Sequence, residues 1–319
     1  MENLDIFNLS LDNFKSEEKQ SSGSDIYKTD PKLSKDSVYR AVIRFIPNLN
    51  NPKKSIVKKF SYWLEDAEGN GFYADCPSSQ PGEKSIIQDT FWKLYKSESA
   101  FEKKQAEKMK RKEYYYSYVL IVKDPQRPEL ENTVQVIRYP RAVKKLIDAQ
   151  IQPSAEDIEM GLEPTNIFDF FGGKDFQLKV TMKGGYWNYE ECKFANNPGS
   201  VTLNGSKMDN NEECRKMILG IYNGVPALED NEFKPWTNET REKVFNYIAE
   251  LTGSNPGSAY QAISSPSPAP KKETPTPPMA GTTETHIVKE TPSIDSASKD
   301  AGNSGDNDIE EWLKEFDIK

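Results

Sequence analysis

The sequence of 319 residues has a single histidine, His286, and only three cysteines, which lie far apart. Histidine-based catalytic triads and most catalytic zinc sites require histidine, and His286 falls in a stretch expected to be a linker. An odd number of widely spaced cysteines argues against a disulfide framework and favours a reducing compartment. We therefore expect neither a disulfide-bonded protein nor a histidine-dependent enzyme.

Two further signals are absent. No apolar run approaches the roughly 18 residues needed to span a bilayer, and the first residues, MENLDIFNLSLDNFKSEE, start acidic, unlike a secretory signal. The segment Gly172–Asp175 has neither the spacing nor the hydroxyl of a phosphate-binding loop. We expect a soluble, intracellular protein without a nucleotide-binding loop, without a cofactor and without a membrane partner.

An acidic cluster, Glu156, Asp157 and Glu159, is the remaining candidate for metal binding or acid–base chemistry. It follows Ser154, a residue type that caps helix N-termini, and carboxylates favour the first turn of a helix because of the helix dipole. We prefer this helical interpretation and do not predict an enzyme.

Charge and composition divide the chain into four parts. An arm at 1–37 is acidic overall and carries apolar residues that dock on a partner or remain mobile. Residues 38–253 are predicted to fold, and residues 254–305, rich in Pro, Ser and Thr, are predicted to form a disordered linker. Residues 306–319 form an acidic tail. Within the predicted core, 38–150 holds 21 Lys and Arg against 14 Asp and Glu, an asymmetry in an otherwise acidic chain.

Hydrophobic alternation predicts strands at 38–46, 115–123, 134–139 and 176–183, the middle two forming a long hairpin. The residues expected to face inward in the first and last strands are Tyr39, Ala41, Ile43 and Phe45, and Phe176, Leu178, Val180 and Met182. Helices are predicted from a cap at Ser85 towards Lys112, around 143–147, and around 244–251 with a stop at Gly253. The fold class is α+β.

Cations alternate with aromatic residues along this core. Single strands of nucleic acid are bound by Lys and Arg that follow the phosphates and by flat rings on which bases stack. The glycine-hinged stretch KGGYWNYEECK at 183–193 is the most specific. The candidate binding residues are Arg40, Arg44, Lys58, Lys59, Lys110, Arg111, Lys112, Tyr115, Tyr116, Arg138, Tyr139, Arg141, Lys179, Lys183, Tyr186 and Tyr189.

Each of these residues also has a plain structural interpretation. The two arginines of the first strand suit an edge strand, and the lysines at 53–59 suit a solvated loop beside a core that includes Phe60 and Trp63. Alternate tyrosines between 114 and 118 must face inward, because side chains alternate along a strand.

Four stretches resemble the single-stranded DNA-binding, helix-destabilising proteins of T-even bacteriophages, the gene thirty-two type. They are YRAVIRFIP at 39–47, SYVLIVKDP at 117–125, VIRYPRAVKKLIDAQI at 136–151 and DFQLKVTMKGGYWNYEECKF at 175–194. Their order and spacing match as well. The resemblance covers roughly 38–195, and the acidic tail by its character.

The resemblance implies an OB-fold-centred core that binds single-stranded DNA cooperatively and without sequence preference, in phage replication, recombination and repair. It implies that the arm contacts neighbouring protomers and that the tail recruits replication and recombination proteins in the cytoplasm of the infected bacterium. The residues that align with the family's binding groove are Arg44, Tyr115, Tyr116, Arg138, Tyr139, Arg141, Tyr186 and Tyr189.

The chain departs from the resemblance at two places. Relatives carry a structural zinc on one histidine and three cysteines, whereas here Cys76 matches only one cysteine and the second of a Cys-x-x-Cys pair is replaced by Ser79. We predict no zinc, with a local hydrophobic core replacing it. Its residues are Ile86, Ile87, Phe91, Trp92 and Leu94. The arm is acidic near its start, not basic, so cooperativity would rest on hydrophobic docking.

Two other functions are also consistent with the sequence. An RNA-binding regulator would use the same groove, although the sequence has no feature that reads a 2′-hydroxyl. A non-catalytic scaffold protein would use the tyrosines for packing only, and its affinity for single strands would not depend on salt.

Removing residues 306–319 should tighten nucleic-acid binding at low salt and abolish partner recruitment. The tail carries six acids and two lysines, and a linker of about fifty residues reaches on the order of 40 Å. It therefore competes with phosphate, and salt screens the competition. Ile309, Trp312, Leu313 and Phe316 recur at helical spacing, which suits docking in a partner's groove. Oligomer titrations at two salt concentrations and pull-downs test this; identical results with both proteins would leave a merely solubilising tail.

Overall fold

The computed structural model describes residues 26–66 and 68–253. The strands are β1 Ile26–Tyr27, β2 Tyr39–Ile46, β3 Val57–Glu65, β4 Gly71–Asp75, β5 Lys112–Lys123, β6 Val134–Pro140, β7 Asp175–Lys183, β8 Tyr186–Asn188, β9 Lys193–Phe194, β10 Thr202–Leu203 and β11 Ser206–Lys207. The helices are α1 Ile86–Tyr95, α2 Ala100–Lys108, α3 Arg141–Ile151, α4 Ala155–Glu159, α5 Glu212–Gly220 and α6 Asn238–Thr252. The predicted arm before residue 26, the linker and the tail lie outside the described residues.

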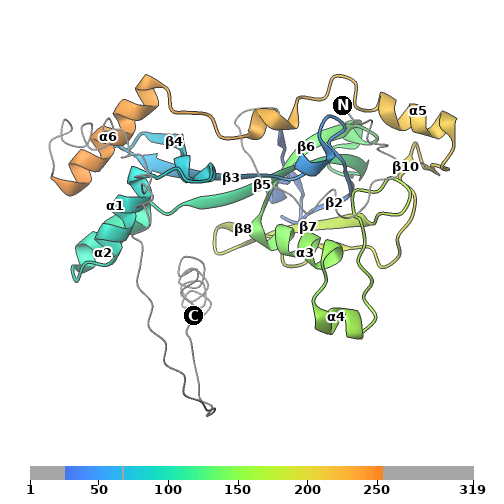
Figure 1. Ribbon diagram of the computed structural model, residues 1–319, viewed down its shortest axis with the longest axis horizontal. Coiled ribbons are helices and arrows are strands. Elements are labelled where there is room, and N and C mark those ends of the chain that lie inside the picture. Colours follow the sequence, from blue (N-terminus) through green and yellow to red (C-terminus); the bar gives the residue numbers. More distant parts are fainter. Residues whose placement is uncertain (1–25, 67, 254–319) are drawn as a thin grey trace, which may run out of the picture. The chain divides into compact units, whose positions relative to one another are not determined.

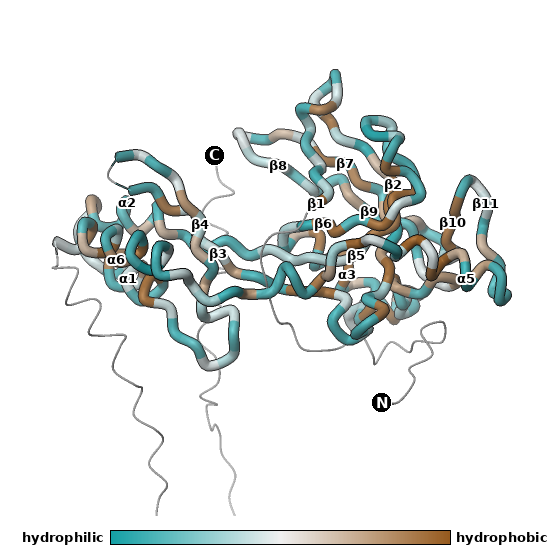
Figure 2. Tube along the Cα trace, turned by 90° about the horizontal axis from the view of Figure 1, so that it is seen from above, coloured by the Kyte–Doolittle hydropathy of each residue, from teal (hydrophilic) through white to brown (hydrophobic). Residues whose placement is uncertain are grey.

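Most strands join one sheet in the order β1-β6-β5-β2-β7-β8, with β3 paired to β4 and β5, and β9 paired to β7. All these pairs are antiparallel except β1 with β6. The four predicted strands are confirmed, as is the β5–β6 hairpin. The mixed α+β class is confirmed too. Figure 2 shows hydrophobic residues concentrated where β2, β7 and β9 lie together.

The predicted alternation holds in β2, where Tyr39, Ile43 and Phe45 are fully buried. In β7 it holds only in part, because Met182 is 37% exposed. Beyond Val180 the strand extends past the core into the hairpin with β8, so the inward face no longer has a core to contact.

The charged segment after Ser85 forms two helices, not the single helix predicted. Ser85 caps α1 as expected, its hydroxyl accepting from the backbone N–H of Gln88. A second cap at Ser99 accepts from the N–H of Glu102 and begins α2. Serine competes for backbone hydrogen bonds inside helices, which explains the break between the two caps.

Two core clusters cover the two faces of the sheet. The first contains Tyr39, Phe45 and Phe176 together with residues of α3, and the second contains Tyr118, Phe170 and Ile218. Side chains that point to either face of β2, β5 and β6 are therefore buried over much of their length.

A third cluster joins α1, α6, β3 and β4, which gather at one end of the β3–β5 pair (Figure 1). Its members include Ile87, Phe91, Leu94 and Cys76, and α6 contributes Val244 and Ile248. The predicted core on α1 is confirmed, and the predicted final helix ends at Gly253, whose φ of 63° suits a left-handed cap.

Cys76 has surroundings unlike those of a metal ligand. Its thiol is fully buried, 3.1 Å from the hydroxyl of Tyr62 and 2.9 Å from Oγ of Ser78. Among the described residues, no group of three or more His, Cys, Asp or Glu side chains is placed to hold a metal ion. Structural zinc needs about four such ligands, so the residues present do not fit the family's zinc.

No described helix is both long enough and apolar enough to cross a bilayer.

We expect the purified protein to contain no stoichiometric zinc. Chelation should leave the melting temperature unchanged, because apolar packing around Cys76 stabilises this region without a metal. Metal analysis together with thermal unfolding, with and without EDTA, tests this. One zinc per chain, with a lower melting temperature after chelation, would refute it.

Candidate nucleic-acid interface

A two-residue turn between β7 and β8 presents one tyrosine to solvent. Gly184 and Gly185 have φ values of 58° and 84°, and Lys183 pairs directly with Tyr186. Positive φ at both central residues is the requirement of a tight hairpin turn whose twist matches the strands. Tyr186 is 80% exposed, so the turn holds its ring away from the core.

Tyr189 follows β8 and lies at the boundary between core and solvent. Its ring packs against the first core cluster, and its hydroxyl is 3.3 Å from Oγ1 of Thr29. Burial raises the pKa of Tyr189, while nearby Arg138 lowers it and Tyr114 raises it further. Tyr189 is therefore fixed at the edge of the first core cluster.

Arg138 on β6 and Tyr114 on β5 form a cation and aromatic pair. The guanidinium carbon of Arg138 lies 4.6 Å from the centroid of the Tyr114 ring, within the range of a cation–π interaction. Burial raises the pKa of Tyr114, Arg138 lowers it, and Tyr73 on β4 raises it. We use the name central site for four residues: Tyr114 and Arg138, which are in contact, and the candidates Tyr186 and Tyr189 of the β7–β8 segment.

A second group of cations and rings lies on the opposite face of the β3–β5 pair. Lys58 is paired with Tyr115, whereas Lys59 is paired with Tyr114, so the two sets alternate. The Lys58 ammonium lies 5.8 Å from the Tyr115 centroid and 3.0 Å from the carboxylate of Glu113. The Tyr115 hydroxyl donates to Glu113 at 2.6 Å. Tyr115 thus has its polar and aromatic contacts within the protein.

Neighbouring residues complete this second group. Arg111 lies 3.9 Å above the Phe60 ring and donates to Oγ of Ser78. Lys144 lies 5.4 Å from the Tyr115 centroid, and Tyr115 stacks on Tyr139. A base has no open face of Tyr115 on which to stack, because the ring is only 5% exposed.

Arg44 is a structural residue. Its side chain is buried, and it donates to the carboxylate of Asp175 at 3.1 Å and to the carbonyls of Asp169 at 3.0 Å and Gly199 at 2.5 Å. A Cβ at Gly173 would lie 2.9 Å from its guanidinium, so the glycine makes room for it. The structure therefore does not place Arg44 where it could contact nucleic acid.

Three further candidates are buried as well. Lys59 is 4% exposed and pairs with Asp75 at 2.7 Å, and Tyr116 is 6% exposed. Tyr139 is 1% exposed, with its hydroxyl 2.9 Å from Oγ of Ser117. Their side chains are covered in the structure, so the structure does not present them on an open surface.

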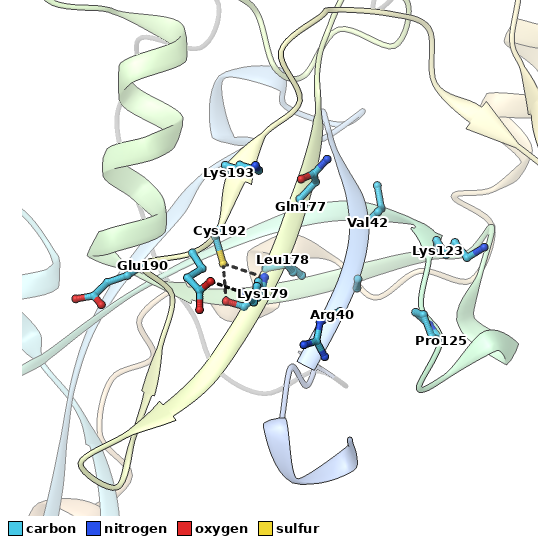
Figure 3. A pocket seen from close by; sticks show the side chains of 12 residues that line it. Arg40, Val42, Lys123, Pro125, Gln177, Leu178, Lys179, Glu190, Cys192 and Lys193 are labelled. Atoms are coloured by element: carbon cyan, nitrogen blue, oxygen red, sulfur yellow. Dashed lines mark hydrogen bonds and ion pairs between the residues drawn. The ribbon is translucent and has the colours of Figure 1, made fainter. Parts of the chain in front are cut away.

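Arg40 and Lys179 belong to a separate pocket on the outer side of β2 and β7 (Figure 3). Arg40 pairs with Asp36 at 2.7 Å, and Lys179 pairs with Glu191. Lys123 and Lys193 line the same pocket. These two predicted cations are not brought to the central site.

The remaining candidates lie near the surface. Lys110 pairs with Glu107 at 3.5 Å, and Lys183 pairs with Glu190 at 3.4 Å. Lys112 is exposed at the start of β5, and Arg141 is half-buried at the start of α3. Of these, Lys183 lies on the hairpin that carries Tyr186.

Two aromatic residues on the β3–β4 hairpin are exposed and absent from the predicted set. Trp63 had been grouped with the core, but it is 38% exposed, and Tyr73 is 62% exposed. Their neighbours Tyr62, Leu64 and Ala74 are buried, so period-two alternation was the signal that could have identified them.

The acidic cluster takes its predicted structural role. Ser154 caps α4, and the Asp157 side chain accepts from the Ser154 N–H in a reciprocal capping box.

Exposed and half-buried aromatic rings beside a cation, on an antiparallel sheet, are typical of proteins that bind single-stranded nucleic acid. Residues 13–222 match the family described as gp32 DNA binding protein like, and the chain belongs to this family. The chain is 32% identical to the single-stranded DNA-binding protein of Enterobacteria phage T4 and 31% identical to that of phage T2. Each alignment spans 166 residues, 49% of this chain and 50% of the relative. The chain thus matches about half the length of these curated relatives.

Arg44→Ala should lower the free energy of unfolding by about 3–5 kcal/mol, because it leaves Asp175 and two carbonyls without their partner. Arg40→Ala on the same strand is the control and should cost less than about 1 kcal/mol, since its pair with Asp36 is exposed. Urea unfolding of both variants measures the difference. Equal costs would contradict the structural role of Arg44.

Proposed function

We propose that the chain binds single-stranded DNA without sequence preference during phage DNA replication, recombination and repair. The observations that carry this proposal are the contact of Arg138 with the Tyr114 ring and the exposed ring of Tyr186 on the β7–β8 hairpin. Rings offer every base a stacking surface, and a cation between them neutralises phosphate. Such binding requires no catalytic group.

The strand arrangement supports an OB-fold-centred core. β2 pairs with β5 on one side and β7 on the other, and β1 adds to the outer edge of β6. The contact between Thr29, just after β1, and Tyr189, just after β8, brings the two ends of the sheet order together. A sheet curled in this way would bring Tyr189 close to the edge strand β1.

Further parts of the proposal rest on the sequence and the family. The acidic tail would recruit replication and recombination proteins through Ile309, Trp312, Leu313 and Phe316, and the arm would contact neighbouring protomers along the strand. The place of action would be the cytoplasm of the infected bacterium. The T4 and T2 relatives are single-stranded DNA-binding proteins, which supports DNA over the alternative of an RNA regulator.

A fluorescence titration with a dT oligomer tests the proposal. Affinity should fall with salt, with a log–log slope of about 0.7 per phosphate neutralised. Tyr186→Ala should weaken binding by roughly 1–3 kcal/mol without loss of stability, since the ring is exposed and stacks only on a ligand.

Phe101→Ala is the matched control, because Phe101 is an equally exposed aromatic residue on α2. It should bind as the unmodified protein does. A matched RNA oligomer bound more tightly than DNA would favour the RNA regulator. Binding that is absent, or unaffected by salt and by Tyr186→Ala, would favour a scaffold protein.

A further inference from the structure

The β3–β4 hairpin holds an exposed pair of large aromatic rings. Trp63 and Tyr73 are directly opposite in the register, with ring centroids 4.6 Å apart at an interplanar angle of 63°. The intervening residues Tyr62, Leu64 and Ala74 point to the opposite face and fill the third core cluster. The pair is thus an outward-facing feature of a hairpin whose other face is fully packed.

Glycine at position 71 allows the indole to lie across the neighbouring strand. Gly71 pairs with Glu65, two residues beyond Trp63, and a Cβ at Gly71 would lie 2.0 Å from Cζ2 of the indole. Glycine weakens a strand, and in a strand it marks a close approach of other atoms. Here the missing side chain leaves the space that the indole occupies, and Trp63 remains 38% exposed.

The pair shares its face of the sheet with the central site. Residues directly opposite on antiparallel strands point to the same side, which places Ser61 with Lys112, and Lys59 with Tyr114, in successive rows after Trp63. The β3 residues of these two rows, Ser61 and Lys59, are buried. Tyr73, which is directly opposite Trp63, belongs to the same face as Tyr114. Lys112 is exposed between the pair and the central site.

We propose that Trp63 and Tyr73 form a second base-stacking platform, which binds an unstacked base of the single strand held at the central site. The proposal rests on the proposed function and extends it from β5, β6 and β8 to the β3–β4 hairpin. Exposed clustered aromatic rings usually mark a binding surface, and flat rings are the groups on which unpaired bases stack. Lys112 supplies a cation for the phosphate between the two positions.

Two variants remove the platform in different ways. Trp63→Leu deletes the ring, and Gly71→Ala displaces it while keeping every core side chain. Both should weaken affinity for a dT oligomer about tenfold, the scale of one lost stacking contact, with little change in melting temperature. Trp63→Phe keeps a ring and should bind within about threefold of the unmodified protein, with less quenching of tryptophan fluorescence on binding.

The controls separate this proposal from the proposed function. Phe101→Ala should have no effect, and Tyr186→Ala reports on the central site. If Tyr186→Ala weakens binding while Trp63→Leu and Gly71→Ala bind normally, the platform is wrong and the proposed function stands; the pair then serves a protein contact. If the unmodified protein does not bind dT, both are wrong.

Discussion

The backbone hydrogen bonding of β5 is the interaction on which the rest of the structure depends. Its residues pair with β2 towards the C-terminal end, with β3 towards the N-terminal end, and with β6 between Tyr114 and Leu120. β5 is therefore hydrogen-bonded both to β2 and β6 of the main sheet and to β3, which belongs to the hairpin that α1 and α6 cover. Because side chains alternate along it, β5 also separates the central site from the cations that contact Phe60 and Tyr115.

The buried arginine shows how the sheet is joined to the segment after α4. Arg44 on β2 reaches backbone carbonyls at Asp169 and Gly199, so a single charged group connects chain segments far apart in the sequence. A buried charge is costly without partners, and here Asp175 and the two carbonyls supply them to the terminal guanidinium nitrogens. Gly173 leaves room for the Arg44 side chain. The glycine of the segment 172–175, which lacks the spacing of a phosphate-binding loop, therefore has a structural role.

Much of the fold could be predicted from the sequence because local signals determine it: alternation for β2 and β7, paired glycines for the hairpin, and serine caps for α1 and α4. The exposed Tyr186 follows from the same signals. Alternation assigns residues to two faces but does not say which face is covered. Arg44 and Tyr139 were therefore placed in the binding surface although distant segments bury them, and Trp63 was placed in the core although its side of the hairpin remains open.

The pairing of β3 with β5 also fixes the distance along β3 between Trp63 and the row that contains Tyr114. Trp63 is four residues along β3 from Lys59, the partner of Tyr114, which corresponds to about 13 Å of strand. Backbone hydrogen bonds, not flexible loops, maintain this separation. If a single strand is held at both positions as proposed, this fixed separation would keep the bound segment at one extension.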